Sequence, residues 1–364
     1  MGVSKIVKGL LLLVIYNLIV YYLGWNVYHF LSTVFHSHFS LIFAIVWLYI
    51  AYSIVISNFN EKFRLTKVVS AYWMVLVEYG LLLFPLADLA LWLIPSLTVL
   101  WVGVAVIGIF ALIIGIGSYM AYSPVIRRKE IAVKKNHPEG KDFRMVIASD
   151  FHLGILSNKK LLQKFVNMSN ETKPDVVLLV GDIVDDHPYW FKAYHMDEVM
   201  KKLTSTYGVY GVLGNHEYYG RQIPIFVEEM KKSSVTILQD ETICIADAFY
   251  LTGREDKTNT TRKSLKELAE HVDQQYPWIV MDHTPSDLRT PTELGVDIHL
   301  SGHTHLGQMW PNQWITKKTF ELDYGYLLKN TTHYLVSSGF GFWGPPIRTN
   351  SRSEMWIVDV KLTD

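Results

Sequence analysis

The 364-residue chain is long enough for two domains of ordinary size, and its formal net charge of zero gives it none of the basic excess typical of nucleic-acid-binding proteins. Its single cysteine, Cys244, excludes an intrachain disulfide and a multi-cysteine zinc site, and is most simply interpreted as a small buried apolar residue. Half of the residues are hydrophobic and only 19% are charged, which is unusual for a wholly soluble protein.

Long apolar segments fill the first third of the chain. A helix needs about 20 residues to cross the hydrocarbon core of a bilayer, and each segment is near or above that length. The first is too long for a signal peptide, lacks an evident cleavage site and is followed by further apolar segments. We therefore predict a four-helix transmembrane domain over residues 1–122. Its expected spans are roughly 9–31, 39–57, 69–94 and 97–122, the last two forming a tight hairpin.

Basic residues alternate between the two sides of these spans. The loop after the first span and the turn between the third and fourth contain no Lys or Arg. This alternation predicts that the N-terminus and the large C-terminal part both lie in the cytoplasm, provided that all four segments cross the membrane. The basic residues on that side are Lys5 and Lys8, then Lys62, Arg64 and Lys67, and finally Arg127, Arg128 and Lys129.

Two carboxylates, Glu78 and Asp88, fall inside the third span. Such residues are costly in a membrane and are often functional, but an ordinary polar contact near the interface explains them equally well.

After a basic linker expected over residues 123–142, the remainder, 143–364, alternates short apolar runs with helical or loop stretches, as in an α/β domain. Five expected strands end on residues able to bind a metal or serve a reacting group. In α/β sheets, ligand sites collect at the carboxyl ends of strands, so these residues should meet in one cleft. The strands and their end residues are 144–150 with Asp150 and His152, 174–182 with Asp182 and Asp185, 207–217 with Asn215 and His216, 276–283 with His283, and 296–305 with His303 and His305.

The chemistry of this set favours two metal ions over one. Asp, His and Asn side chains suit divalent Mn, Fe and Zn, and thiolates are absent from the set. An aspartate at a strand end can bridge two cations, and a pair of metals about 3.5–4 Å apart is the usual clamp for displacement at phosphorus. Three glycines, Gly181, Gly214 and Gly302, would allow tight turns and close backbone approach.

The motifs DFH (150–152), GDIVD (181–185), GNHE (214–217), His283 and GHTH (302–305) resemble, in order, the motif series of the calcineurin-like metallophosphoesterases. The resemblance covers roughly residues 143–360. It implies a four-layer α/β sandwich, with two β-sheets flanked by helices, and a site for two divalent ions, with Mn favoured over Fe or Zn.

The same resemblance implies a role for each residue. One metal would be bound by Asp150, His152 and His305, the other by Asn215, His283 and His303, with Asp182 bridging them. His216 would stabilise the transition state or protonate the leaving group, and Asp185 would orient His216 or its neighbours.

The last motif and the tail at 337–360 are also similar to the membrane-attached bacterial branch of that superfamily. Leu306 stands where a glycine is more usual in that branch. Arg348 is either a clamp for substrate phosphate oxygens or an ordinary surface arginine.

Three other features are predicted to be structural or to cover the site. His299 alternates with Ile298 and Leu300 on a strand and should face another layer of the sandwich. The polar stretch 253–264 is predicted to be a mobile cover. The aromatic stretch 187–195 is better explained by packing than by contact with lipid or substrate.

We expect an integral protein of a bacterial cell membrane that hydrolyses a phosphoester or pyrophosphate bond through metal-bound hydroxide. Because four spans exceed what tethering requires, an amphiphilic substrate is favoured, such as a phospholipid or a lipid-linked phosphate. The expected partners are thus the lipid bilayer and this substrate, and not nucleic acid. The alternative is a membrane sensor whose phosphoesterase domain acts on a soluble nucleotide or serves as a metal-dependent binding module.

Overall fold

The computed structural model describes residues 3–37, 40–60, 62–135 and 141–363. The chain divides into two compact units, Met1–Gly115 and Ile116–Asp364.

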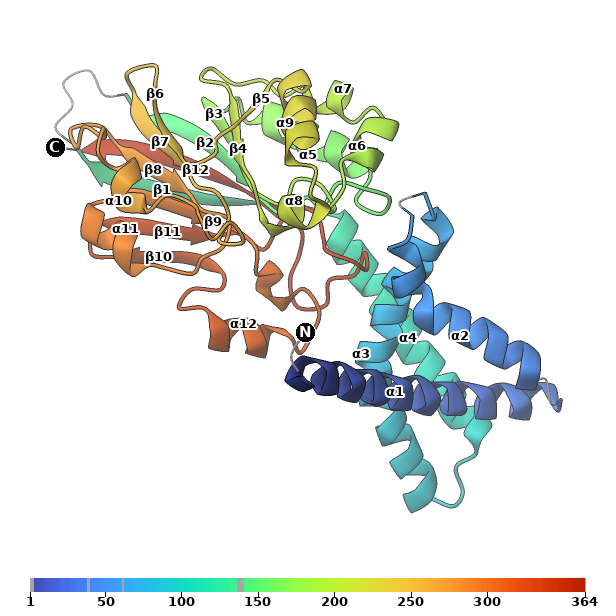
Figure 1. Cartoon of the computed structure of the whole chain (residues 1–364). Coiled ribbons are helices and arrows are strands. Elements are labelled where there is room, and N and C mark those ends of the chain that lie inside the picture. The colour runs from blue at the N-terminus through green and yellow to red at the C-terminus, as the bar shows by residue number, and fades with distance from the viewer. Residues whose placement is uncertain (1–2, 38–39, 61, 136–140, 364) are drawn as a thin grey trace. The chain divides into compact units, whose positions relative to one another are not determined.

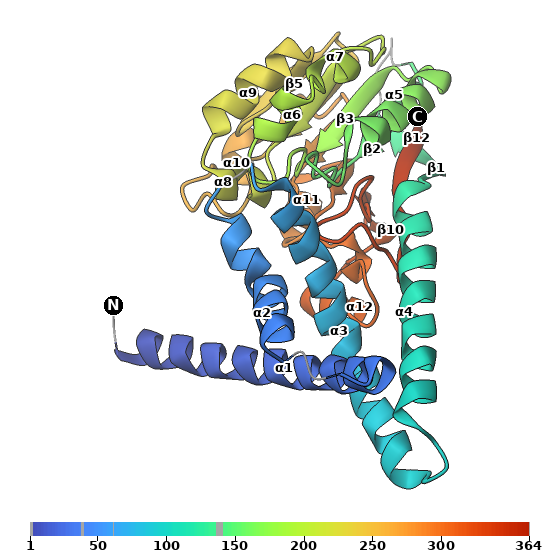
Figure 2. The same ribbon diagram turned by 90° about the vertical axis from the view of Figure 1, so that its right-hand side faces the viewer.

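The first unit is made of long apolar helices: α1 (Val3–Phe35), α2 (Ser40–Ser57), α3 (Arg64–Leu93) and most of α4 (Val99–Tyr122). All four are long and apolar enough to cross a membrane, which confirms the expected helices (Figure 2). A short turn joins α3 to α4, as the sequence predicts. The helices pack through a small core that includes Leu23, Trp47 and Trp73, while most of their Leu, Ile and Val side chains face outward, as lipid-facing helices require.

Asp88 makes an ordinary polar contact inside this unit. Its carboxylate accepts a hydrogen bond from the Tyr22 hydroxyl at 2.6 Å. It also lines an apolar cavity of about 690 Å³ between α1, α3 and α4. The contact accounts for this carboxylate without a catalytic role.

The second unit contains two six-stranded sheets. The first, in spatial order, is β1 (Val125–Lys134), β12 (Glu354–Thr363), β2 (Phe143–Ala148), β3 (Val176–Val180), β4 (Val209–Val212) and β5 (Val235–Ile237). The second is β10 (Gly325–Lys329), β11 (Thr332–Val336), β9 (Ile298–Ser301), β8 (Trp278–Met281), β7 (Phe249–Gly253) and β6 (Glu241–Ile245).

Short helices accompany the sheets. They are α5 (Lys159–Glu171), α6 (Tyr189–Ala193), α7 (Asp197–Met200), α8 (Asn215–Gly220), α9 (Ile223–Lys232), α10 (Leu265–Leu268), α11 (Arg289–Leu294) and α12 (Gln313–Thr319), with a 3-10 turn at His305–Gly307.

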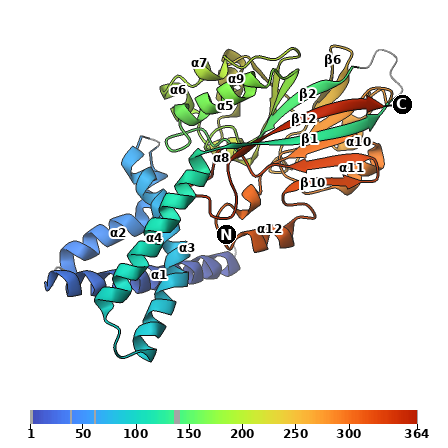
Figure 3. The ribbon, with the colours of Figure 1, turned by 180° about the vertical axis from the view of Figure 1, so that it is seen from behind.

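Three hydrophobic clusters separate four layers, which confirms the predicted sandwich (Figures 1 and 3). The first lies between α5, α7 and α9 and one face of the first sheet, and includes Phe165 and Met230. The second lies between the two sheets, and the third joins the second sheet to α10. Strand β3, with the sequence VVLLV, is buried at every residue because both of its faces are covered.

Strand β1 occupies part of the stretch expected to be a linker. It pairs in parallel with β12 from Val125 to Lys134, and its Ile131 and Val133 are buried in the core between the sheets. The other side chains of β1 are exposed or partly exposed, and the four at 127–130 are charged, so the sequence resembles a basic linker. The expected burial of Cys244 was wrong, because this residue is exposed on β6, an edge strand of the second sheet.

The strands that carry the motifs are parallel neighbours: β2 beside β3, β3 beside β4, and β8 beside β9. Their carboxyl ends therefore lie at a common edge of each sheet, as required for their end residues to meet.

Candidate metal centre

The structure brings the motif residues together as two neighbouring groups of potential ligands. In each group the ligand atoms lie within 4.8 Å of one another. The first group is Asp150, His152 and His305, and the second is Asp182, His283 and His303. Asn215 joins the second group, because its Oδ1 lies 2.8 Å from His303 Nδ1.

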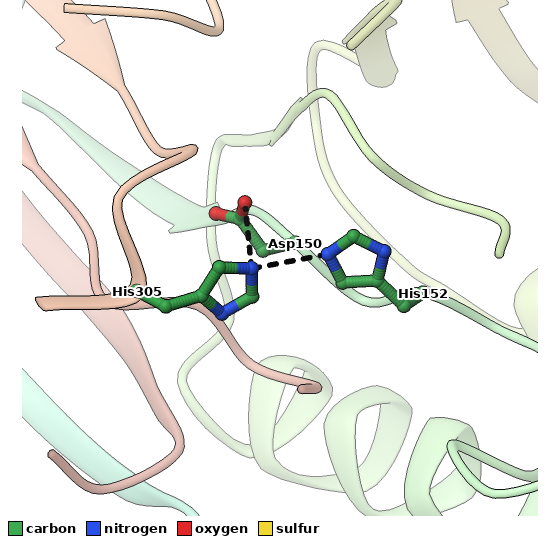
Figure 4. A group of neighbouring side chains, drawn as sticks. All are labelled: Asp150, His152 and His305. Atoms are coloured by element: carbon green, nitrogen blue, oxygen red, sulfur yellow. Dashed lines mark hydrogen bonds and ion pairs between the residues drawn. The ribbon is translucent and has the colours of Figure 1, made fainter. Parts of the chain in front are cut away.

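In the first group three ligand atoms converge on one point (Figure 4). His305 Nε2 lies 3.1 Å from His152 Nε2 and 3.4 Å from Asp150 Oδ1. Burial holds the pKa of both histidines well below the usual range, so both rings are neutral and can offer electron pairs. Burial also raises the pKa of Asp150 to about 6. A divalent cation among these atoms would offset the cost of burying the carboxylate and satisfy both rings.

The second group is arranged around His283. Its Nδ1 lies 2.8 Å from the Val180 carbonyl oxygen, and its buried Nε2 lies 3.1 Å from Asp182 Oδ2. Burial alone would lower the pKa of His283, but the charge of Asp182 outweighs it and raises the pKa well above the usual range, so a cation at Nε2 would replace a proton there. The same Asp182 oxygen is 3.8 Å from His152 Nε2 in the first group. Asp182 thus lies between the two groups, where a bridging ligand would have to be.

Backbone strain is concentrated at these residues. Positive φ angles occur at Asp150 (52°), His152 (45°), Asp182 (51°), His303 (71°) and His305 (51°). Such a conformation costs about 1–3 kcal/mol at each non-glycine residue and persists only when the surroundings enforce it. Its concentration here is typical of a functional site.

Two of the predicted glycines are required by close approach. A Cβ at Gly302 would collide with the Asp150 carboxylate, and a Cβ at Gly214 would collide with Asp182. Glycine therefore lets the strand ends come close enough for the ligands to converge.

Glu217 is a site residue that the sequence analysis missed. Its carboxylate is almost fully buried and accepts hydrogen bonds from the backbone N–H groups of Ile183 at 2.8 Å, Val184 at 3.0 Å and Gly214 at 2.8 Å. It therefore ties the ends of β3 and β4 together. Burial raises the pKa of Glu217 to about 7. The signal was available, because Glu217 is the last letter of the GNHE motif.

His216 lies beside both groups and is oriented by Asp186. Its Nδ1 is 2.6 Å from Asp186 Oδ1, and its backbone N–H donates to Asp182 Oδ1 at 2.9 Å. Burial alone would lower the pKa of His216, but the hydrogen bond to Asp186 and the charge of Asp182 outweigh it and raise the pKa to about 9. From the motif series, Asp185 was expected to have this orienting role. Asp185 belongs to the same cluster, but the hydrogen bond to the His216 ring comes from its neighbour.

Arg348 is placed differently from a substrate clamp. Its side chain is fully buried, and its guanidinium donates to Gly341 O at 2.6 Å, Ser338 O at 2.7 Å and Ser351 Oγ at 2.6 Å. One of its nitrogens also lies 3.2 Å from His305 Nδ1. This placement favours a role in positioning the tail loop and His305 over one in gripping phosphate.

The stretch 253–264 is anchored, contrary to the expected mobile cover. Arg254 and Arg262 both donate to the buried Asp282, at 2.7 and 3.2 Å, and Asp240 accepts the Lys263 N–H at 2.6 Å. His299 is buried with its ring 5.3 Å from that of Tyr334 and belongs to neither ligand group.

The part of the chain that holds these residues is similar to known proteins. Residues 143–307 match the family model described as calcineurin-like phosphoesterase. The chain contains a calcineurin-like phosphoesterase domain.

Proteins similar to this chain occur in bacteria and animals. A protein named as a metallophosphoesterase in Helicobacter pylori is 32% identical over 59% of this chain and 59% of its own length. One from Aquifex aeolicus is 28% identical over 62% of this chain and 87% of its own. A Bos taurus protein named "transmembrane protein with metallophosphoesterase domain" is 28% identical over 65% of this chain and 56% of its own. The chain thus spans under two thirds of the length of the first and third of these relatives.

A dimetal phosphatase from Danio rerio is among the similar solved structures. Its identity is 14% over 53% of this chain and 86% of its own, with a TM-score of 0.36.

Proposed function

We propose that the chain is a membrane-inserted, metal-dependent hydrolase of phosphoester or pyrophosphate bonds. The observation that carries the proposal is the pair of buried ligand groups with Asp182 between them and His216 beside them. Imidazole, carboxylate and amide side chains form a donor set that suits divalent Mn, Fe or Zn, and we favour Mn. When bound, two such ions supply Lewis acidity, which activates water and neutralises charge on phosphoryl oxygens.

The protein's own side chains supply the remaining chemistry. Because Asp186 engages Nδ1 of His216, the other ring nitrogen is the atom available to donate a proton. A protonated His216 can stabilise charge on a phosphoryl oxygen or protonate the leaving group. Glu217 holds Asp182 and Asn215 in position, because its carboxylate accepts hydrogen bonds from the backbone N–H groups of Asp182 and of Gly214, the residue before Asn215.

For the substrate we propose an amphiphile, such as a phospholipid or a lipid-linked phosphate or pyrophosphate, reached from the cytoplasmic leaflet. Support comes from four helices suited to a membrane and from the arrangement of Lys and Arg around them. The competing proposal is a membrane sensor whose domain acts on a soluble nucleotide or only binds a ligand.

The deciding experiment uses the full-length chain in lipid nanodiscs with added Mn, Fe or Zn. A panel of phospholipids, lipid-linked pyrophosphates and soluble nucleotides is assayed for released phosphate. We expect the lipid substrates to be hydrolysed fastest. A strong preference for soluble nucleotides over every lipid would overturn the substrate proposal while leaving the reaction class intact.

The reaction class is tested with Asp182→Asn, which should abolish hydrolysis because the residue between the two ligand groups loses its charge. Asp247→Asn is the matched control, since Asp247 is exposed and lies in the turn between β6 and β7, away from the motif residues. A binding module would show no metal-dependent hydrolysis in the wild type and unchanged ligand binding in the Asp182 variant.

A further inference from the structure

The last turns of α4 contact the loop that borders the metal centre. The carbonyl oxygens of Gly117, Met120 and Ala121 accept hydrogen bonds from residues of the tail loop 337–353. The bonds are Arg348 N to Gly117 O at 3.0 Å, Ser353 N to Met120 O at 3.2 Å and Ser353 Oγ to Ala121 O at 2.7 Å. Packing is close as well, because a Cβ on Gly117 would collide with Ile347.

These contacts fix the depth of the tail loop relative to a bilayer. Gly117 lies inside the apolar span Val99–Tyr122, and only about 8 Å of helix separates it from Tyr122. The polar headgroup region of each leaflet is about as thick as this distance. A loop that hydrogen-bonds to Gly117 and Ala121 therefore lies at the level of the headgroups when α4 spans the membrane.

Both this loop and the end of α12 reach the metal centre. The ring of Trp343 lies 6.3 Å from that of His216. Gln308, three residues after His305, holds the backbone of Trp343 through bonds of 2.8 and 2.9 Å. At the end of α12, the Phe320 ring lies 6.0 Å from that of His303.

Large apolar side chains are exposed on these segments. Their exposed fractions are 44% for Trp310, 63% for Trp314, 65% for Ile315 and 46% for Trp343. The basic residues Lys317 and Lys318 are exposed on α12 beside them. We call these six residues the interfacial rim.

The composition of the rim suits a bilayer surface. Tryptophan is enriched at the headgroup level of membranes, where its amphipathic ring is stable. Lysine near the surface gains about 1 kcal/mol from anionic lipids. A rim of tryptophan, isoleucine and lysine combines both contributions, as interfacial amphipathic segments do.

We propose that the interfacial rim contacts the bilayer surface, with anionic phospholipid headgroups as its partner, so that the metal centre opens onto the membrane interface. This inference rests on the contacts of α4 and the tail loop and does not require the substrate to be a lipid. A lipid-contacting rim and a soluble substrate are compatible outcomes.

The test uses the full-length chain with Cys244→Ser, which removes its single cysteine, and one nitroxide label at Ile315→Cys. The label is measured in nanodiscs that contain phosphatidylglycerol. Accessibility to oxygen, which concentrates in lipid, is compared with accessibility to a water-soluble nickel chelate. We expect oxygen access to exceed nickel access at residue 315. A second label at Trp314→Cys guards against a local effect of either substitution.

The matched control is a label at Leu328→Cys. Leu328 is 50% exposed, and on β10 it pairs with His333 near the start of β11, so it lies at the end of that sheet away from the metal centre. There we expect nickel access to exceed oxygen access. The combined change Lys317→Glu and Lys318→Glu should shift residue 315 toward nickel access.

Either of two results would overturn the inference. Labels at 314 and 315 that respond like the one at 328 would show a rim in water. Labels shielded from both reagents would show that protein, such as a second copy of the chain, covers the rim.

Discussion

Two neighbouring aspartates, Asp185 and Asp186, show how finely the site depends on single residues. Asp186 has a φ of 58°, and its carboxylate lies 2.6 Å from His216 Nδ1. The motif series pointed to Asp185 and not to Asp186, because which of the two carboxylates faces the histidine depends on a left-handed backbone turn at Asp186. Arg348 was expected to be either a phosphate clamp or a surface arginine for a related reason, since its burial depends on how the tail folds back onto the last turns of α4.

We predict that Asp186→Asn lowers the pKa of His216, because the bond to Asp186 helps to hold it at about 9. A group that acts when protonated then loses its proton at lower pH, so the alkaline limb of kcat/KM moves to lower pH. The measurement is a pH–rate profile on a soluble phosphoester. Asp185→Asn is the control, and a larger displacement of the limb by that variant would contradict the assignment.

His216→Gln should lower kcat by a factor on the order of 10² to 10⁴, the usual contribution of a positioned acid. Bound metal, measured by elemental analysis, should be unchanged, since His216 belongs to neither proposed ligand set. Loss of metal together with activity would instead identify His216 as a ligand.

His299 gives a prediction about stability. Burial lowers the pKa of His299 to about 4, below its ordinary value of 6.5. Between these values the unfolded chain binds a proton that the folded chain excludes, so stability falls as pH decreases through this window. The loss between pH 7 and pH 5 amounts to about 2 kcal/mol. Melting temperatures of the full-length chain in detergent should show a smaller acid loss for His299→Leu than for the wild type, and equal losses would contradict this account.

At the scale of elements, the ends of β3 and β4 are joined by one carboxylate. Glu217→Gln replaces one accepting oxygen with an NH₂ group that faces backbone donors, so we expect a loss of about 2 kcal/mol and weaker metal binding. Thermal unfolding with and without Mn measures both effects. Glu228→Gln, an exposed change on α9, is the control. Equal stability of the two variants would contradict the proposed role of Glu217.

Strand β1 marks a limit of prediction for elements. The strands that carry motifs were found because each is a continuous apolar run with a polar end. β1 has a run of four charged residues, 127–130, and its partner β12 lies over 200 residues later in the sequence. The pattern of β1 alone favours a linker, and only pairing with a distant strand makes it part of the sheet.

At the scale of the whole molecule, the membrane helices followed from composition, and the four-layer architecture followed from the resemblance that the motif series carries. The anchoring of 253–264 was not foreseen, because its ion pairs join this stretch to Asp282, which follows β8 later in the sequence.

Metal removal should lower the thermal stability of the phosphoesterase domain. The two groups bury carboxylates and unpaired imidazole nitrogens that a cation would satisfy, so chelation should lower the melting temperature of the full-length chain. Adding Mn should restore the melting temperature. Calorimetric titration should then show two equivalents of Mn bound by the wild type and fewer bound by Asp182→Asn. Unchanged melting on chelation would contradict a metal centre.

The bonds between α4 and the tail loop have a mechanical consequence. Gly117, Met120 and Ala121 are spaced three and four residues apart, so their bonded carbonyls lie along one side of the helix. A helix held along one side cannot spin independently of the body that holds it. The last turns of α4 and the tail loop should therefore rotate as one body, so that a spin label on either segment reports the motion of both.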